Sequence, residues 1–350
     1  MYEVKRCISE YCANPGRSTH RMAIEAAERV FETRELVSEL INANAPERIA
    51  FTLNATHALN AAIKGCINHK CHVITSDLEH NSVTRPLNAL KKGVGIDISA
   101  FDSDLPLEKA ISGLVRDDTE FIVTTLASNV TGKVFDPSEL SRVARKHSLF
   151  VIADASQYLG HLPLDMKKSP LDIVCAPAHK GLLGIPGGGF LSVQSESKMQ
   201  TILEGGSGGD TFDVEMPRVL PERLEAGTVG LPAIVGLGAG IKYLNQVGAK
   251  CIEERIKSLT LRLCDVLTSC GASIYGCENG IASFEIEGHS STELAMYLDG
   301  EGIAVRDGLH CAPGIHRKLG TASRGLVRAS LSIFNSNRQL DRLYRVLKQM

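Results

Sequence analysis

The sequence contains no run of apolar residues long enough to cross a membrane. Its most apolar stretch, residues 231–241, is short and rich in glycine, whereas a spanning helix needs roughly 18 such residues. Residues 1–20 mix charged residues with glycine and proline, and they lack the apolar segment of a secretory signal. We therefore expect a cytoplasmic protein with no role at a membrane.

A strong charge of either sign is also missing. The formal net charge is −2, and no long block of like charges occurs. Because proteins that bind nucleic acid usually carry a basic patch or tail, we expect no nucleic-acid partner.

The ten cysteines form no C-x-x-C pair. Cys7 and Cys12 are close in sequence, as are Cys66 and Cys71, but no second pair completes a zinc site. A chain of 350 residues can bury a large core without disulfides or a structural metal. We therefore predict no metal site, and we expect most of the cysteines to be small core residues.

What is present is the composition of a globular protein, with 43% hydrophobic and 22% charged residues. Strand-like and helix-like segments alternate, which predicts an α/β fold with a doubly wound, mostly parallel sheet. We expect strands at 48–53, 73–76, 94–101, 121–126, 149–153, 172–176 and 188–193. We expect helices at 18–42, 105–115, 137–147 and 232–247, and a further helix after residue 57. Ser18 or Thr19 is the expected cap of the first helix, and residues 195–225 read as a mobile loop.

The pattern changes near residue 245. Beyond it we expect strands at 281–286, 303–305 and 326–332, and helices at 250–270, 291–299 and 338–349. This arrangement predicts a large domain over residues 1–245 and a smaller α+β domain over residues 246–350.

Polar side chains follow several predicted strands directly. Asn129, Asp154 and Lys180 each come after a strand, and His80 lies just past another. Because ligands bind at the carboxyl edge of such sheets, these four residues can converge on one site. The alternative for His80 is an ordinary solvated loop histidine.

The stretch from Asp154 to Gly189 holds an acid, a lysine behind a histidine, and a glycine cluster. A lysine in a dry site can have a lowered pKa and form a Schiff base with a cofactor aldehyde. Enzymes that use pyridoxal 5'-phosphate pair such a lysine with an acid at the pyridine nitrogen. We therefore interpret Lys180 as the cofactor lysine and Asp154 as that acid. The alternative for Lys180 is a surface lysine.

A third signal is N-A-T-H at residues 54–57, which reads as a turn that leads into a helix. Thr56 and His57 would then lie where a helix N-terminus can bind a phosphate. The alternative is an ordinary helix cap.

Motifs over nearly the whole chain, in order, resemble those of the fold-type I, class V aminotransferase-like enzymes of the cysteine desulfurase/selenocysteine lyase family, of the group II type. The matching stretches are N-A-T-H-A-L-N (54–60), E-H-N-S (79–82), S-N-V-T-G (128–132), D-A-S-Q (154–157), A-H-K-G-L-L-G (178–184), R-L-E-A-G-T (223–228), A-V-R-D-G-L-H-C-A-P (304–313) and V-R-A-S-L-S-I-F-N (327–335).

The resemblance implies roles for residues of the cofactor site. Lys180 would carry pyridoxal 5'-phosphate, Asp154 would pair with its ring nitrogen, and His80 would stack on its ring and assist catalysis. The remaining contacts would be made by Asn129 and Gln157, to the substrate or the ring oxygen, and by Thr56, His57 and His179, to the phosphate. Thr228 would reach the phosphate of a neighbouring subunit, which implies a homodimer with shared active sites.

The resemblance also implies roles for residues near the substrate. Arg328, with Arg306, would bind the substrate, Arg328 as a fork on the carboxylate; its alternative is a surface arginine. Cys311 lies in R-D-G-L-H-C-A-P and would attack the substrate sulfur and become a persulfide. Arg306 and His310 would lower the pKa of its thiol, and the alternative is a structural cysteine.

The function implied is a cysteine desulfurase, which converts L-cysteine to L-alanine and passes the sulfur to an acceptor protein, for example in iron–sulfur cluster assembly. Three features depart from the family pattern. The N-A-A-T-like segment near the start is missing, Pro177 replaces a serine or threonine that binds phosphate, and His57 replaces a common glutamate. Two alternatives therefore stay open. One is an enzyme for L-selenocysteine or another class V activity, and the other is a cofactor-binding protein with activity impaired by the missing segment.

Overall fold

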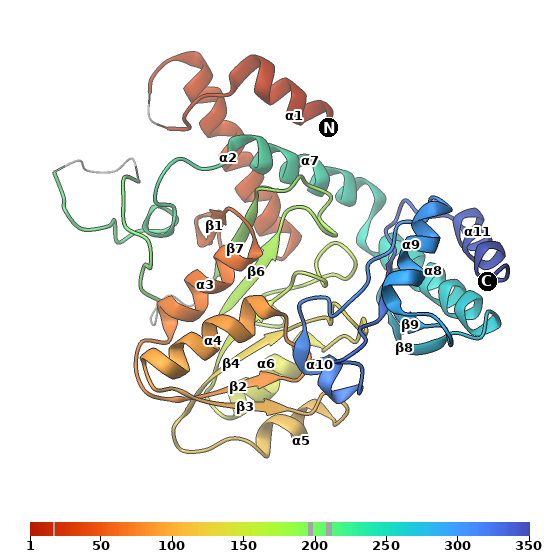
Figure 1. Cartoon of the computed structure of the whole chain (residues 1–350). Coiled ribbons are helices and arrows are strands. Elements are labelled where there is room, and N and C mark those ends of the chain that lie inside the picture. The colour runs from red at the N-terminus through yellow and green to blue at the C-terminus, as the bar shows by residue number, and fades with distance from the viewer. Residues whose placement is uncertain (17, 195–198, 208–211) are drawn as a thin grey trace.

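A large sheet and a small sheet organise the chain in the computed structural model, which describes residues 1–16, 18–194, 199–207 and 212–350 (Figure 1). The large sheet has the strand order β1-β7-β6-β5-β4-β2-β3. Its strands are β1 (Ile49–Thr52), β2 (His72–Ser76), β3 (Asp97–Phe101), β4 (Thr119–Thr125), β5 (Phe150–Asp154), β6 (Ile173–Pro177) and β7 (Gly189–Val193). All neighbours from β3 to β6 pair in parallel, while β7 runs antiparallel to β6 and β1. The predicted α/β fold is confirmed.

The central strands are buried along their whole length, as parallel strands covered by helices on both faces are. One face packs against α3 (Ala55–Cys66) and α4 (Asn81–Gly93). The other face packs against α2 (Arg21–Leu40), α5 (Leu107–Ser112), α6 (Pro137–Lys146) and α7 (Leu231–Val247).

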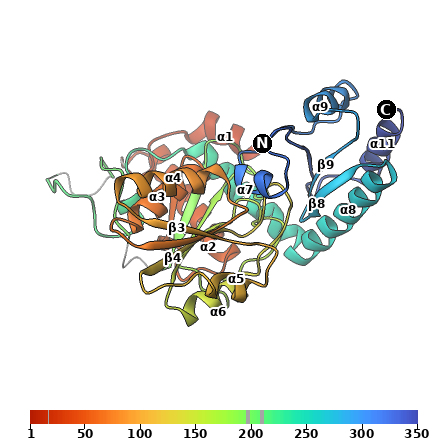
Figure 2. The ribbon, with the colours of Figure 1, turned by 60° about the horizontal axis from the view of Figure 1, so that its bottom comes forward.

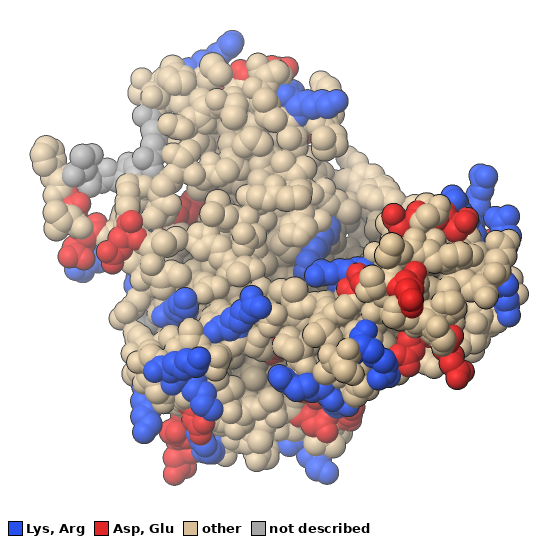
Figure 3. Space-filling view, in the orientation of Figure 1, with Lys and Arg blue, Asp and Glu red and all other residues tan. Residues whose placement is uncertain are grey.

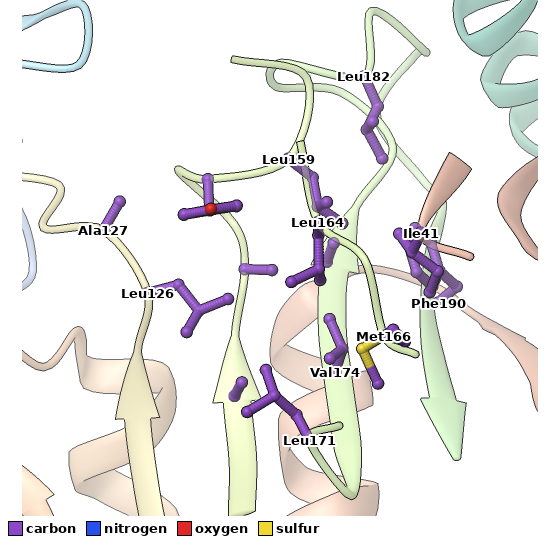
Figure 4. Packing of buried hydrophobic residues seen from close by; sticks show 14 of the residues in the cluster. Ile41, Leu126, Ala127, Leu159, Leu164, Met166, Leu171, Val174, Leu182 and Phe190 are labelled. Carbon is purple, nitrogen blue, oxygen red and sulfur yellow. The ribbon is translucent and has the colours of Figure 1, made fainter. Parts of the chain in front are cut away.

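The core on the second face supports the ends of the strands. Figure 4 shows Leu159 and Leu164, from the loop after β5, close to Val174 of β6 and Phe190 of β7. All four side chains are at most 3% exposed. The close packing of this layer holds the loops that carry polar residues at the carboxyl edge.

The small sheet has the order β10-β9-β8 and lies to one side of the large one (Figure 2). It consists of β8 (Ser273–Glu278), β9 (Ile281–Glu285) and β10 (Val327–Ser330), and it is accompanied by α8 (Ala249–Ser269), α9 (Ser291–Gly300) and α11 (Asn337–Leu347). These elements share a separate apolar core that includes Leu259, Phe284, Leu294 and Leu343. We keep the division of the chain near residue 245 as a proposal.

The helix α10 (Pro313–Lys318) belongs to the second half of the sequence but lies beside the large sheet (Figure 1). The Lys318 amine bonds to Asp77 at 2.7 Å and to Asp102 at 2.5 Å, both in loops that follow large-sheet strands. The segment that contains Cys311 is therefore held between the two sheets.

Some expected elements differ from the structure. No strand forms at 303–305; Arg306 instead makes a single bridge to Arg328, after which the chain turns at Gly308 with φ 91°. The cap of α2 is His20, whose Nδ1 accepts from the Ala23 amide, and not Ser18 or Thr19. Segments that form helix or strand without having been predicted are α1 (Tyr2–Arg6), a π-helix (Cys7–Tyr11), α4, β8 and α10.

The predicted mobile loop at 195–225 falls partly on residues 195–198 and 208–211, which lie outside the described residues. Two short 3₁₀ helices, Pro46–Arg48 and Glu222–Leu224, complete the elements of the described ranges. No helix within those ranges combines the length and the apolar content needed to cross a bilayer.

Candidate active site

Asp154 and Lys180 mark the site at the carboxyl edge of the large sheet. Asp154 is the last residue of β5, is 4% exposed, and accepts a hydrogen bond from the Ser156 amide at 2.9 Å. Lys180 follows the end of the neighbouring strand β6. Burial lowers the pKa of the Lys180 amine; the Asp154 carboxylate opposes this shift, and the cations of Arg328 and Arg306 add to it. The four charged groups are therefore close enough to act on one another.

His80 lies at the same edge and caps α4. Its Nδ1 accepts from the Ser82 amide at 3.0 Å, so the proton of the neutral ring is on Nε2. Burial lowers the pKa of His80, and Asp154 and Lys180 both act on it. His80 is therefore a neutral ring within the site.

The start of α3 brings hydroxyl groups to His80. Thr56 Oγ1 and Ser82 Oγ are 2.8 Å apart, and Ser82 Oγ is 2.9 Å from His80 Nδ1. Asn54 caps α3 by accepting from the His57 amide at 2.9 Å, so an ordinary cap is present at the first turn. The exposed hydroxyl of Thr56 and the helix dipole still make this end suitable for an anion.

Glycine places α3 against the sheet. A Cβ on Gly189 would lie 2.6 Å from the carbonyl carbon of Asn54, so a larger residue would push the helix start away. Gly189 pairs with Pro177, which is buried at the end of β6 and has no hydroxyl to offer. The hydroxyls near this end of the site come from Thr56 and Ser82 instead.

Cys311 lies in a loop with an uncommon backbone. His310 and Cys311 have φ of 51° and 58°, a left-handed region that costs a residue with a side chain about 1–3 kcal/mol. The Cys311 carbonyl accepts from the Asn81 amide at 2.7 Å. The thiol is exposed, and Arg306 Nη2 lies 3.7 Å from its sulfur. The guanidinium therefore lies within contact distance of the sulfur.

His310, which precedes Cys311 in the same loop, has a buried and neutral ring. Its ring is buried, and this burial lowers its pKa to about 4, so the ring is neutral. Its Nε2 donates to the Arg306 carbonyl at 3.2 Å. Arg306 is therefore the cation beside the sulfur, and the expected help of His310 to the thiol stays a prediction.

Arg328 faces the same space from β10. Its Nη1 donates to the Asn129 carbonyl at 2.9 Å. Its Nε is buried and has no hydrogen-bond partner in the described part of the chain. Burial and the neighbouring Arg306 lower the pKa of Arg328 to about 10. Asn129, also buried, donates from Nδ2 to the His310 carbonyl at 2.7 Å. A buried N–H without a partner indicates a missing acceptor.

Three other predicted residues lie differently. His179 is exposed beside Lys180. The Gln157 carbonyl accepts a hydrogen bond from Asn279 at 2.9 Å, and this bond joins the loop after β5 to the turn between β8 and β9. Thr228 is exposed and lines a cavity of about 1560 Å³ between α2 and residues 204–207 and 213–229. Lys180 and Cys311 are not among the residues that line this cavity, so Thr228 stands apart from the other predicted residues within one chain.

The loop that carries Thr228 is anchored by a buried ion pair. Arg34 of α2 binds Glu225 through both guanidinium nitrogens, at 2.8 and 3.0 Å. Glu225 also accepts from the Phe51 amide at 2.6 Å. The pair links the loop to β1 and α2.

The residues at this edge fit pyridoxal 5'-phosphate. A desolvated amine with a lowered pKa, Lys180, stands near a buried carboxylate, Asp154. The start of α3 packs closely against Gly189 and carries hydroxyl groups, so it can bind an anion beside these two residues. This donor set matches a cofactor that carries an aldehyde, a basic ring nitrogen and a phosphate.

Sequence reasoning missed several residues that shape the site. Glu79 is 1% exposed and accepts from Ser76 Oγ and the Thr125 amide, at 2.5 and 3.0 Å. In its motif E-H-N-S only His80 was predicted to take part in the site. The same motif also contains Asn81, whose amide donates to the Cys311 carbonyl, and Ser82, whose hydroxyl contacts both Thr56 and His80. His316 and Thr321 are buried behind Cys311 and had no sequence signal.

Away from the site, His69, Cys71 and Glu120 place three ligand-type atoms within 4.8 Å of one another. They lie at the amino ends of β2 and β4, at the opposite edge of the sheet. His69 Nε2 and Glu120 Oε1 are 2.6 Å apart, so a hydrogen bond accounts for this contact. The prediction of no metal site stays a prediction.

The family model described as aminotransferase class-V matches residues 1–343. A probable cysteine desulfurase from Methanothermobacter thermautotrophicus is 32% identical, over 98% of this chain and 89% of the relative. A probable cysteine desulfurase from Pyrococcus abyssi is 31% identical, over 97% of this chain and 88% of the relative.

Solved structures agree with these sequence relatives. The apo structure of a cysteine desulfurase from Thermococcus onnurineus NA1 superposes with a TM-score of 0.92 at 28% identity, covering 99% of this chain and 90% of that one. The cysteine desulfurase CsdA from Escherichia coli gives a TM-score of 0.90 at 25% identity, covering 99% and 90%. This chain is similar to each of them over almost its whole length.

Proposed function

The chain belongs to the class-V aminotransferase family, and from this membership we propose that it is a cysteine desulfurase that uses pyridoxal 5'-phosphate to convert L-cysteine to L-alanine. The observation that carries the proposal is the meeting of three groups at one site. An amine of lowered pKa, an arginine whose buried N–H has no partner among the described residues, and an exposed thiol beside a guanidinium converge there.

Bound pyridoxal 5'-phosphate supplies an aldehyde that condenses with amines and a ring that accepts the electrons of a carbanion. Lys180 would hold the aldehyde carbon and Asp154 the ring nitrogen. Thr56, His57 and His179 would contact the phosphate. Asn129 and Gln157 are proposed to contact the substrate or the ring oxygen.

Arg328 is proposed to bind the substrate carboxylate. Its Nε–H is buried and unpaired in the described part of the chain, and a carboxylate oxygen is the acceptor that a guanidinium fork prefers. Arg306 lies next to it through the bridge between their backbones. Together the two cations attract an amino acid and orient its side chain toward Cys311.

Lys180 is proposed to move the proton at the substrate α-carbon. Because burial lowers the pKa of its amine, the neutral base is more accessible than in a surface lysine. His80, neutral and with its proton on Nε2, presents a flat ring and a donor to the same space.

Cys311 is proposed to take the sulfur. Its thiolate attacks the sulfur of L-cysteine, a new S–S bond forms, and the Cβ–S bond breaks. The electron pair of the broken bond stays on Cβ, which is then protonated to the methyl group of L-alanine. The persulfide on Cys311 next transfers its outer sulfur to an acceptor thiol, for which an acceptor protein is the proposed source. The exposure of Cys311 suits that second transfer.

We propose a homodimer in which the loop with Thr228 reaches the partner's site. Phe212 and Val214 of this loop are 96% and 97% exposed, and Val219 is 64% exposed. Figure 3 shows a broad area in the upper half of the molecule where charged side chains are sparse. A second copy that covers these apolar side chains would remove them from water. A cytoplasmic location remains part of the proposal.

The test uses purified protein incubated with pyridoxal 5'-phosphate and L-cysteine. The wild type is expected to gain a visible absorption band and to release alanine and, with a thiol, sulfide. Lys180→Ala should lose the band and both products. Cys311→Ser should keep the band but lose sulfide release from L-cysteine.

The outcomes separate the alternatives. A band without products from L-cysteine would indicate the cofactor-binding protein with impaired activity. Products from L-selenocysteine but not from L-cysteine would indicate a selenocysteine lyase. No band at all would contradict the cofactor assignment.

A further inference from the structure

The polar side chains behind the Cys311 loop form a chain that the mechanism above does not use. His310, His316 and Thr321 are 2%, 0% and 0% exposed. His310 Nδ1 lies 3.4 Å from His316 Nε2, and His316 Nδ1 lies 2.8 Å from Thr321 Oγ1. The two rings are stacked, with centroids 5.6 Å apart. Every ring nitrogen therefore faces another polar atom of the chain or the Arg306 carbonyl.

The Arg306 carbonyl, at one end of this series of hydrogen bonds, determines which atom donates in each contact. The Arg306 carbonyl can only accept, so His310 Nε2 carries the proton in that contact. The neutral His310 ring then has its lone pair on Nδ1, which requires His316 Nε2 to donate. His316 Nδ1 in turn accepts from the hydroxyl of Thr321. A single arrangement of protons, running from Thr321 to Arg306, satisfies all three contacts.

This chain ends on the part of the backbone that positions the thiol. The Arg306 carbonyl also accepts from the Arg328 amide at 2.7 Å, and the His310 carbonyl accepts from Asn129 at 2.7 Å. The next carbonyl, that of Cys311, accepts from the Asn81 amide at 2.7 Å. The left-handed backbone at His310 and Cys311 is thus held by contacts on its carbonyls and on the His310 ring.

We propose that His316 and Thr321 are positioning residues, which act through the His310 ring to hold Cys311 in its left-handed conformation beside Arg306. Without the Thr321 hydroxyl, the His316 lone pair has no donor and its ring loses the orientation that serves His310. The loop then relaxes toward ordinary backbone angles, and the sulfur moves away from the guanidinium. Neither residue touches the sulfur itself.

The inference rests on the proposed function where it is tested by turnover of L-cysteine. It does not rest on that function where it is tested by chemical labelling of Cys311. The variants are Thr321→Val, which removes the hydroxyl at nearly constant volume, and Thr321→Ser, which retains it. The matched control is Thr33→Val in α2, because Thr33 is also buried, at 3% exposure, and its hydroxyl donates to the Arg29 carbonyl.

The first measurement is the rate at which iodoacetamide labels Cys311 as a function of pH, followed by peptide mass spectrometry. Cys12 and Cys251 are exposed and serve as references in the same sample. Thr321→Val should label more slowly at Cys311 and require a higher pH, with both references unchanged. Thr321→Ser and Thr33→Val should match the wild type. His316→Phe should resemble Thr321→Val.

The second measurement is steady-state turnover of L-cysteine with the cofactor-loaded protein. Thr321→Val should lower kcat by about tenfold to a hundredfold, the loss expected when a reacting atom is displaced by about 1 Å, with KM and the cofactor band unchanged. Equal Cys311 labelling in the wild type and in Thr321→Val, or equal loss in the Ser and Val variants, would overturn the proposal. If the wild type itself fails to act on L-cysteine, the proposed function fails, while the labelling comparison still decides the role of Thr321.

Discussion

Arg328 is the residue whose surroundings most narrow the choice of substrate. Its guanidinium is largely buried, one nitrogen is used by the Asn129 carbonyl, and the Nε–H has no partner in the described ranges. A guanidinium in this state costs free energy unless an anion completes its bonds. The residue therefore favours a substrate with a carboxylate.

Replacing Arg328 with lysine should weaken substrate binding. A lysine cannot reproduce the fork, and a hydrogen bond to a charged group contributes about 1.5–3 kcal/mol, so KM for L-cysteine should rise by about 10- to 150-fold. The control is Arg324→Lys, since Arg324 is exposed and binds Glu285 on the surface. Steady-state kinetics with both variants tests this, and an unchanged KM in Arg328→Lys would contradict the assigned role.

Glu79 should make stability depend on pH in a direction opposite to that of most carboxylates. Burial raises its pKa to about 7, from 4.5, so the folded protein favours the protonated acid. The stability from this group is present below about pH 4.5 and is lost as the pH rises through about 7. Glu79→Gln, which stays neutral, should therefore gain in melting temperature over the wild type as the pH rises.

Thermal unfolding of Glu79→Gln and the wild type, from pH 5 to pH 8.5, measures this difference. The gain should grow up to about pH 7 and then level off. A difference that is constant over the whole range would show that Glu79 keeps one protonation state.

At the scale of elements, the short helix α10 joins the Cys311 loop to the large sheet. Lys318 at its end bonds to Asp77, Asp102 and Asp104, at 2.7, 2.5 and 2.8 Å. Burial opposes the charge of Lys318, but the hydrogen bonds to these three carboxylates outweigh it and raise the pKa of the amine. The cluster holds a segment of the second half of the chain against loops of the first half.

Lys318→Met should loosen this attachment. Three carboxylates would remain without their shared cation, and they would repel one another. A partly exposed network of this kind is worth about 1 kcal/mol or slightly more, so the protein should stay folded. Hydrogen exchange of residues 306–320 should become faster, and sulfur release should fall while the cofactor band persists.

The control is Arg317→Met, which removes a cation from the same helix outside this cluster. If both variants show the same exchange at 306–320, the cluster does not anchor α10.

Elements were predictable where their signals are local. The apolar runs of β2, β4, β5 and β6 and the Asp136 cap with Pro137 of α6 were identified from neighbours in the sequence, and the structure places their ends within two residues of those expected. The short helix α10 was missed because its six residues are held by Lys318 bonds to distant aspartates. The strand expected at 303–305 does not form, because this segment pairs with β10 only through the single bridge between Arg306 and Arg328.

At the scale of the whole molecule, the exposed apolar loop predicts assembly. Phe212 and Val214 are almost fully exposed, and the large cavity between α2 and this loop is open. The Arg34–Glu225 pair ties the residues that follow this segment to α2. Such a surface suits a second copy of the chain.

If the proposed homodimer forms through this loop, replacing both Phe212 and Val214 with glutamate should convert it to a monomer. Charged side chains in a buried apolar contact are costly, and like charges from two copies repel. Light scattering after size exclusion measures the mass, and cofactor retention should fall if Thr228 reaches the partner's site as we propose. A wild type that is monomeric at micromolar concentration would contradict the shared site.

The sequence by itself determined the α/β fold, the family, and the candidates Lys180, Asp154, His80, Arg328 and Cys311. Strand patterns and motifs are local, and parallel strands bring their carboxyl ends to one edge, so residues after those strands meet. The tertiary structure decided the rest. It made His310 a neutral, buried link, and it left Arg328 Nε without a hydrogen-bond partner among the described residues. It also placed His316 and Thr321 behind Cys311. Burial and side-chain direction depend on contacts between distant segments, and these properties decide both protonation and hydrogen bonding.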